Sequence, residues 1–158
     1  TNKLQPGDMF PDITLNTIDG GEINLPADLD SPFTAVHFIA AIGALLPPLL
    51  AGYEERREAL AAQGVTMIAA AVDSLEKTSE VAQPLGFPVA HGVTRAQGDS
   101  LGAWWDEGRD FIQPSEFILT KSGKVMASTY SNSPVGRMGA AETLTLIEFI
   151  NAQRAKKT

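Results

Sequence analysis

Residues 33–72 read FTAVHFIAAIGALLPPLLAGYEERREALAAQGVTMIAAAV, and they carry the clearest structural pattern of the 158-residue chain. The first nine, 33–41, are almost wholly apolar, and their length and flanks favour a buried central strand. Leu49–Gln63 has helical spacing, with Gly64 where a C-terminal cap is wanted. Val65–Val72 is a second apolar run. The stretch therefore predicts a strand, a helix and a parallel strand.

Shorter elements flank this unit on both sides. Asp19-Gly20-Gly21 separates two short apolar runs and predicts an N-terminal β-hairpin, because glycine accepts positive φ. The further predicted elements are a helix over about 75–83, a strand over 88–93, a small helix from Asp99 or Ser100 that carries Leu101, Trp104 and Trp105, a hairpin of 117–119 with 125–130, and a helix over 140–155 with Leu144, Ile147, Phe149 and Ile150 inward. With no repeat and no long linker, residues 1–158 are predicted to form one α/β domain, a mixed central sheet with helices on both faces.

Composition excludes several classes of function. The formal net charge of −7 disfavours nucleic acid and anionic membrane surfaces as partners. No apolar stretch reaches the ~18 residues of a membrane span, and the N-terminus lacks the pattern of a signal peptide, so we expect a cytoplasmic protein. The chain has no cysteine, and its two histidines are too far apart for a metal motif. No dinucleotide or phosphate motif is present, so we expect neither a metal nor a cofactor.

Several short motifs occur in the order of one known family. They are Leu4–Ile13 with its Gly-Asp and Pro-Asp pairs, Asp19–Ile23, Gln63–Ser74 ending in Val-Asp-Ser, and Phe117–Val125 around a glycine turn. Over about residues 4–150 the chain resembles the redoxin or peroxiredoxin branch of the thioredoxin-like proteins, named for alkyl hydroperoxide reductase and thiol-specific antioxidant. The resemblance implies a thioredoxin-like, peroxiredoxin-type fold. It also implies a homodimer, because members of the family often form dimers.

The departure from that family falls on its reactive site. Such proteins carry a reactive cysteine after the first long strand, at a helix start where the dipole and nearby cations lower the thiol pKa. If Gly43 aligns with the family glycine, Ala44 and Pro47 occupy the two sulfur positions. We therefore expect no thiol peroxidase or disulfide reductase activity. Four explanations stay open: natural loss of the thiol, a cysteine-to-alanine change at Ala44, a different local alignment, and other chemistry in the same pocket.

The resemblance also indicates where a ligand would bind. A cis-proline in this family faces the reactive loop from the start of a later strand, which makes Pro114 a candidate cis bond. Adjacent tryptophans on a short helix point to different sides, so at most one of Trp104 and Trp105 packs easily in a core. We expect a groove formed by Gly43, Ala44, Pro47, Trp104 and Pro114 that binds a small apolar molecule or a protein or peptide partner.

Two residues are candidates for acid–base chemistry without sulfur. His37 lies in the apolar strand on one face with Ala35 and Ile39, either as a satisfied core histidine or as a general base. Arg137 precedes the last helix, either binding an anionic group or bonding to a nearby carbonyl or carboxylate. An enzyme that uses these groups is the alternative to a binding protein.

Overall fold

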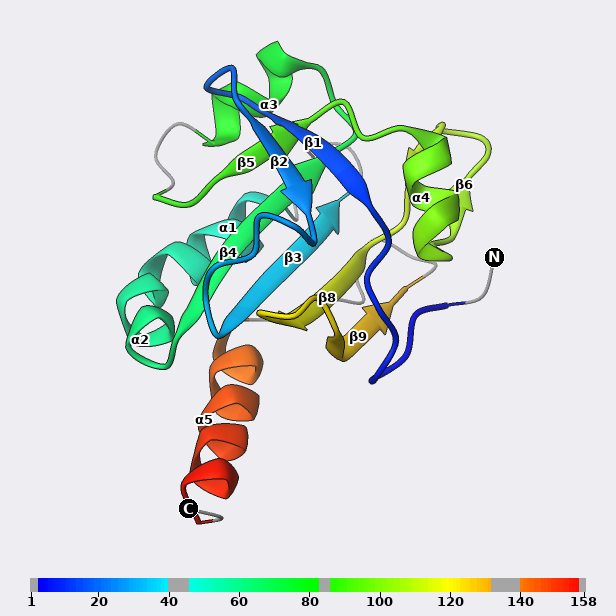
Figure 1. Cartoon of the computed structure of the whole chain (residues 1–158). Coiled ribbons are helices and arrows are strands. Elements are labelled where there is room, and N and C mark those ends of the chain that lie inside the picture. Colours follow the sequence, from blue (N-terminus) through cyan, green and yellow to red (C-terminus); the bar gives the residue numbers. More distant parts are fainter. Residues whose placement is uncertain (1–2, 40–45, 83–85, 132–139, 157–158) are drawn as a thin grey trace.

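The computed structural model describes residues 3–39, 46–82, 86–131 and 140–156. Its main sheet has seven strands in the order β2-β1-β5-β4-β3-β8-β9 (Figure 1). The strands are β1 (Ile13–Thr17), β2 (Glu22–Leu25), β3 (Phe33–Ile39), β4 (Val65–Ala71), β5 (Val89–His91), β8 (Ser115–Thr120) and β9 (Val125–Tyr130); β6 (Trp105–Asp106) and β7 (Phe111–Ile112) form a separate pair. Strand β4 runs parallel to β3 and β5, and the other neighbours are antiparallel. The predicted mixed sheet and N-terminal hairpin are confirmed.

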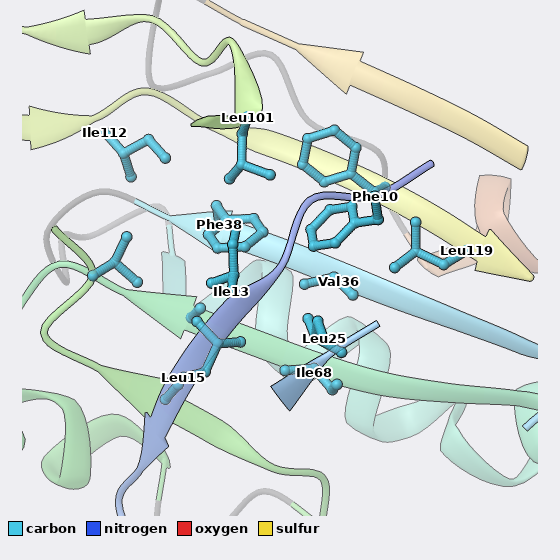
Figure 2. Close-up of a cluster of buried hydrophobic side chains, with 14 of the residues drawn as sticks. Phe10, Ile13, Leu15, Leu25, Val36, Phe38, Ile68, Leu101, Ile112 and Leu119 are labelled. Carbon is cyan, nitrogen blue, oxygen red and sulfur yellow. The ribbon is translucent and has the colours of Figure 1, made fainter. Parts of the chain in front are cut away.

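Helices cover both faces of this sheet, as predicted. They are α1 (Leu46–Glu55), α2 (Arg57–Ala62), α3 (Leu75–Ala82), α4 (Arg95–Leu101) and α5 (Ala140–Lys156). On one face, Tyr53, Leu60 and Ile147 bring α1, α2 and α5 into a buried cluster with alternate residues of β3. On the other, Leu101 of α4 and Phe10 of the N-terminal segment join a second cluster (Figure 2). None of the described helices is long and apolar enough to span a membrane.

The central strand β3 holds the two halves of the core together. All seven of its residues are buried. Successive side chains of a strand point to opposite faces, so Val36 and Phe38 enter the cluster of Figure 2 while Ala35 and Ile39 enter the other. The ring centroid of Phe10 lies 6.4 Å from that of Phe38. Each such buried side chain contributes about 1.5–3 kcal/mol to folding.

The predicted helix over 49–63 is two helices. The backbone leaves helical geometry at Arg56, whose N–H bonds to the carbonyl of Tyr53, three residues back. Gly64 then ends α2 at a φ of +83°. Its predicted capping role is confirmed, because this left-handed conformation is strained for any residue with a Cβ.

The small helix predicted from Asp99 or Ser100 begins earlier and ends earlier. A capping box between Thr94 and Gln97 starts α4 at Arg95, and Gly102 ends it at a φ of 74°. The two tryptophans therefore do not share a helix. Trp104 follows the helix end, and Trp105 opens the short strand β6.

The inward face predicted for the last helix is partly wrong. Ile147 is fully buried, and Leu144 and Ile150 are half-buried against the same cluster. Phe149 is 61% exposed. Residues two apart on a helix point roughly 200° away from each other, so Phe149 cannot face the core while Ile147 does.

Candidate functional site

One end of the sheet holds two of the residues that the sequence assigned to a groove, Trp104 and Pro114. Strand β3 leaves the sheet beside β8, with Phe38 paired to Ser115. The N–H of Gln113 donates to the carbonyl of Trp104 over 2.9 Å, so Trp104 lies next to the approach to Pro114. Two predicted groove residues, Gly43 and Ala44, and the candidate Arg137 lie outside the described residues, and Pro47 is the second residue of α1. Whether this end of the sheet forms a binding groove stays a prediction.

The cis bond predicted at Pro114 is wrong. Among the described residues the cis peptide bond is Leu25–Pro26, so Gln113–Pro114 is trans. The chain there is already bonded as extended backbone, because the carbonyl of Pro114 accepts from the N–H of Ser131 over 3.0 Å. A ligand that binds here would not rely on a cis bond to expose the neighbouring backbone.

Trp104 stands at the surface beside a cation. Its side chain is 43% exposed, whereas Trp105 packs against the core, as expected for adjacent tryptophans. The ammonium of Lys3 lies 3.9 Å from the Trp104 ring centroid and donates to the carbonyl of Gly102 over 3.2 Å. These groups and Asp99 line a hollow of about 440 Å³. The hollow therefore combines an aromatic wall with donors and acceptors.

A second polar feature is buried under helix α1. His37 on β3 and Glu116 on β8 stand directly opposite each other in the strand register. Nδ1 of His37 donates to Oε2 of Glu116 over 2.7 Å, and both side chains are only 2% exposed. Among the described residues, Nε2 of His37 has no hydrogen-bond partner. The carboxylate thus fixes the ring orientation and leaves the second nitrogen free.

Tyr53 of α1 connects this pair to α5. Its ring centroid lies 4.4 Å from that of His37, and its hydroxyl is 2.8 Å from Oγ1 of Thr143. Burial raises the pKa of the Tyr53 phenol well above its ordinary value; the hydrogen bond to Thr143 opposes this, and the charges of Glu116 and Glu142 add to it. The cluster therefore stabilises a neutral phenol between the sheet and two helices.

Chemically, the cluster offers an oriented imidazole but no open access. His37 is 1% exposed. A histidine held by a carboxylate is the arrangement of general acid–base catalysis, but it acts only on a group within hydrogen-bond reach. In the described part of the chain no three His, Asp or Glu side chains group to hold a metal ion.

Sequence reasoning identified His37 but missed Glu116, Tyr53 and Thr143. One signal was available for Glu116, which directly precedes the apolar run of β8. A carboxylate and an imidazole that are both buried each require a polar partner, because burying such groups unpaired is costly. Tyr53 and Thr143 carry no comparable signal, since both residue types are common on ordinary helices.

Comparison with solved structures shows which fold this is. The protein aligns with peroxidoxin BcpB from Mycobacterium tuberculosis at a TM-score of 0.76 and 16% identity, over 94% of this chain and 97% of that one. It aligns with Mycobacterium tuberculosis AhpC at 0.80 and 14%, over 96% of each chain, and with Enterococcus faecalis AhpC at 0.80 and 14%, over 98% and 97%. At these identities the likeness establishes the thioredoxin-like, peroxiredoxin-type fold and nothing finer.

Comparison with sequences gives the family. No curated protein sequence matches the chain. The sequence model of the AhpC/TSA family matches residues 6–128, well over half of the chain, and that range includes β3, the residues that follow it and the His37–Glu116 pair. The expected resemblance is thereby confirmed, and this cysteine-free chain belongs to the AhpC/TSA family.

Proposed function

We propose that this chain is a cysteine-free redoxin-like domain that binds a partner at the former reactive site and does not reduce peroxides itself. The observation that carries the proposal is that the whole family-matched range, residues 6–128, contains no cysteine. Thiol peroxidases and disulfide reductases act through a thiolate, and no other side chain supplies that nucleophile and redox couple. Loss of the thiol with retention of the fold favours binding over catalysis.

An extended peptide segment of another protein is the occupant we favour. Trp104 offers an exposed aromatic face, while the ammonium of Lys3, the carboxylate of Asp99 and the carbonyl of Gly102 stand beside it. A peptide has both the apolar side chains and the backbone polar groups to match such a surface. A small apolar molecule would match the ring alone. We expect the domain to act in the cytoplasm as a homodimer, the form that the family resemblance implies.

Two assays test the proposal. The unmodified protein should consume no hydroperoxide in the presence of reductants, and measurable turnover would refute the proposal. For binding, the protein selects from a displayed library of random peptides, beside Trp104→Ala and a control, Met9→Ala, at another exposed residue. We expect Trp104→Ala to weaken the selected peptides about 30-fold, the loss typical of an interface tryptophan, and Met9→Ala to leave them unchanged.

The result of selection distinguishes the possible occupants. If no peptide depends on Trp104 and native mass spectrometry finds an apolar molecule on the protein purified from cells, the occupant is a small molecule. If neither is found, the binding proposal is wrong, whatever the peroxide assay gives.

A second candidate function is an enzyme that uses His37 as an acid–base group. The buried pair with Glu116 and the free Nε2 favour it. The low exposure of His37 argues against it. Diethylpyrocarbonate should modify the partly exposed His91 and spare His37. Modification of both at similar rates would show that His37 is open to small molecules and would favour the enzyme.

The third alternative, a cysteine-to-alanine variant of an antioxidant enzyme, has a direct test. Ala44→Cys should restore rapid reaction with hydroperoxide only if the rest of a peroxidatic site has survived. A thiol at position 44 with the reactivity of a free cysteine would exclude this alternative. Turnover of hydroperoxide by Ala44→Cys would support it against the natural loss of function proposed above.

A further inference from the structure

The N-terminal segment places a lysine side chain in the hollow beside Trp104. Nζ of Lys3 lies 3.9 Å from the centroid of the Trp104 ring and 5.3 Å from that of Tyr130, the last residue of β9. Both distances are within the roughly 6 Å over which an aromatic face attracts a cation. The ammonium also donates to the carbonyl of Gly102 over 3.2 Å. Two rings and one acceptor therefore contact the same cation.

The groups that contact this ammonium are held in place by the fold. The hydroxyl of Tyr130 donates to the carbonyl of Leu101 over 2.5 Å and accepts from the N–H of Leu4 over 2.9 Å. Gly102 is fixed as the left-handed residue that ends α4, with a φ of 74°. Because none of these contacts uses the side chain of Lys3, the Tyr130 ring and the Gly102 carbonyl would keep their places without it.

Lys3 is held in the hollow by its side chain alone. Within the part of the chain that the structure describes, its backbone makes no hydrogen bond. The next residue, Leu4, ties the segment to β9, because its carbonyl also accepts from Oγ of Ser128 over 2.7 Å. The lysine side chain can therefore rotate out while the segment stays bound. Trp104 is 43% exposed even with Lys3 in place, so its ring is open to a ligand.

The charges around the hollow favour a cation. Lys3 is the one cation among the described residues that line it, and Asp99 is the one carboxylate. Residues 95–110, from α4 to the β6–β7 pair, carry more acidic than basic side chains: Asp99, Asp106, Glu107 and Asp110 against Arg95 and Arg109. The charge of Arg95 is already compensated by two hydrogen bonds to Glu107. Without Lys3, the hollow would present aromatic faces, a carbonyl and a negative charge.

The Tyr130 ring stays neutral and so keeps its attraction for a cation. Burial raises the pKa of this phenol, the hydrogen bond with Leu4 opposes the rise, and the charge of Asp8 adds to it. Asp8 is thus a further carboxylate on the side of the N-terminal segment. A positive ligand meets no other free cation among the residues named here.

We propose that this hollow recognises a primary ammonium group, the side chain of a lysine in the peptide partner, and that Lys3 occupies the site as an internal competitor until that lysine displaces it. The inference rests on the peptide-binding site of the proposed function and names the residue type that the peptide contributes. The carbonyl of Gly102 accepts an N–H, so a primary ammonium should bind better than a quaternary one, which has a charge but no donor.

Butylammonium tests the site without a peptide, because it is a lysine side chain without a backbone. Titrated to about 200 mM at constant ionic strength, it should shift the indole N–H signal of Trp104 in nitrogen-15 NMR spectra. It should leave the signal of Trp105, whose indole N–H donates to Asp110 over 3.0 Å. Tetramethylammonium should bind more weakly, and butanol should leave both signals unchanged. An equal shift by butanol, or no shift by butylammonium in either the parent or Lys3→Ala, would refute the ammonium site.

Replacing Lys3 should have the opposite effect from replacing an ordinary contact residue. Lys3→Ala removes the competitor, so butylammonium should bind about two- to fivefold more tightly, the strength of an exposed cation–π contact. Lys3→Arg keeps a cation and should bind like the parent. The matched control is Lys121→Ala, which removes an exposed lysine just after β8 and should also bind like the parent. Weaker binding by Lys3→Ala would show that the ligand needs Lys3, and would refute its displacement.

The peptides that depend on Trp104 link this site to the proposed function. Synthesised with blocked ends, they should share a lysine. Replacing it with norleucine, which keeps the carbon chain, should weaken binding to Lys3→Ala about two- to fivefold and binding to the parent by less. Peptides that tolerate norleucine in Lys3→Ala would refute lysine recognition and leave peptide binding in place. If no peptide is selected but butylammonium binds as expected, the proposed function fails and the ammonium site stands.

Discussion

Replacing His37 and Glu116 together with leucine should cost far less stability than replacing Glu116 alone. The two side chains face each other across β3 and β8 at 2.7 Å and are almost fully buried. Glu116→Leu removes the only hydrogen-bond partner that the His37 ring has among the described residues, where Nε2 is already unpaired. The imidazole would then stand in an apolar core with both nitrogens unsatisfied.

The expected magnitudes follow from that geometry. Removing one member of a buried, hydrogen-bonded pair costs about 3–5 kcal/mol, whereas replacing both with apolar residues of similar volume is near neutral or stabilising. We therefore expect Glu116→Leu to lower the melting temperature by about 6–20 °C, at about 2–4 °C per kcal/mol for a domain of this size. The double variant should melt at a higher temperature than Glu116→Leu, because it leaves no unpaired imidazole in the core. The coupling energy between the two sites should exceed about 2 kcal/mol.

Urea unfolding followed by far-UV circular dichroism at pH 7 measures this coupling in four proteins: the parent, the two single leucine variants and the double variant. Glu116→Gln is the matched control, because its amide oxygen can still accept from Nδ1 of His37, and we expect a loss of about 1 kcal/mol. If the two leucine substitutions add to within about 0.5 kcal/mol, the residues do not act as a pair and the interpretation of this cluster is wrong.

Three further predictions concern the helices and turns. Because burial raises the pKa of Tyr53 above its ordinary 10.0, the stability gained from its neutral phenol is fully present below about pH 10 and falls above it. Tyr53→Phe should therefore flatten the decline in unfolding free energy between about pH 10 and 12, by up to about 1.4 kcal/mol per pH unit. An unchanged slope would contradict this assignment. In urea titrations, Gly123→Ala should destabilise the protein by at least about 1 kcal/mol more than Gly20→Ala. Both glycines have φ near +90°, but only at position 123 would the new Cβ meet Pro26, at 2.7 Å. Equal losses of stability would remove the steric argument. Thr94→Ala should cost about 1 kcal/mol by removing the cap of α4, while Thr94→Ser should retain most of it, a difference that calorimetry can resolve.

The elements that the sequence predicted well are those whose burial appears in the chain itself. Every residue of β3 is buried, so its apolar run marks the strand directly. The hairpin turns carry glycines whose φ is positive in the structure, as at Gly20 and Gly123. The prediction for α4 started the helix at Asp99 or Ser100 and extended it over the tryptophans. In the structure its start is set by the capping box of Thr94 and Gln97. Local hydrogen bonding therefore sets this boundary, and hydrophobic spacing does not.

The polar cluster was harder to predict, because it depends on register. Residues 37 and 116 are separated by 79 positions, and they meet only because β3 pairs antiparallel with β8 in one alignment. Shifting that pairing by one residue would turn every side chain of β8 to the other face. A sequence can show that a buried histidine and a buried carboxylate each need a partner. It cannot show that they are each other's partner until the strand order is known.

The same register is compatible with the proposed loss of the thiol. The sheet is held by the pairing of β3 with β4 and β8, and helices α1 and α5 are joined through Tyr53 and Thr143. None of these contacts uses sulfur, so the loss of a thiol that we propose at position 44 would leave them in place. The Ala44→Cys variant should therefore fold like the parent, and its reaction with hydroperoxide should report only on the surviving site. A variant that unfolds would show that the alanine has become part of the packing, which would make the loss of the thiol an established feature of this scaffold.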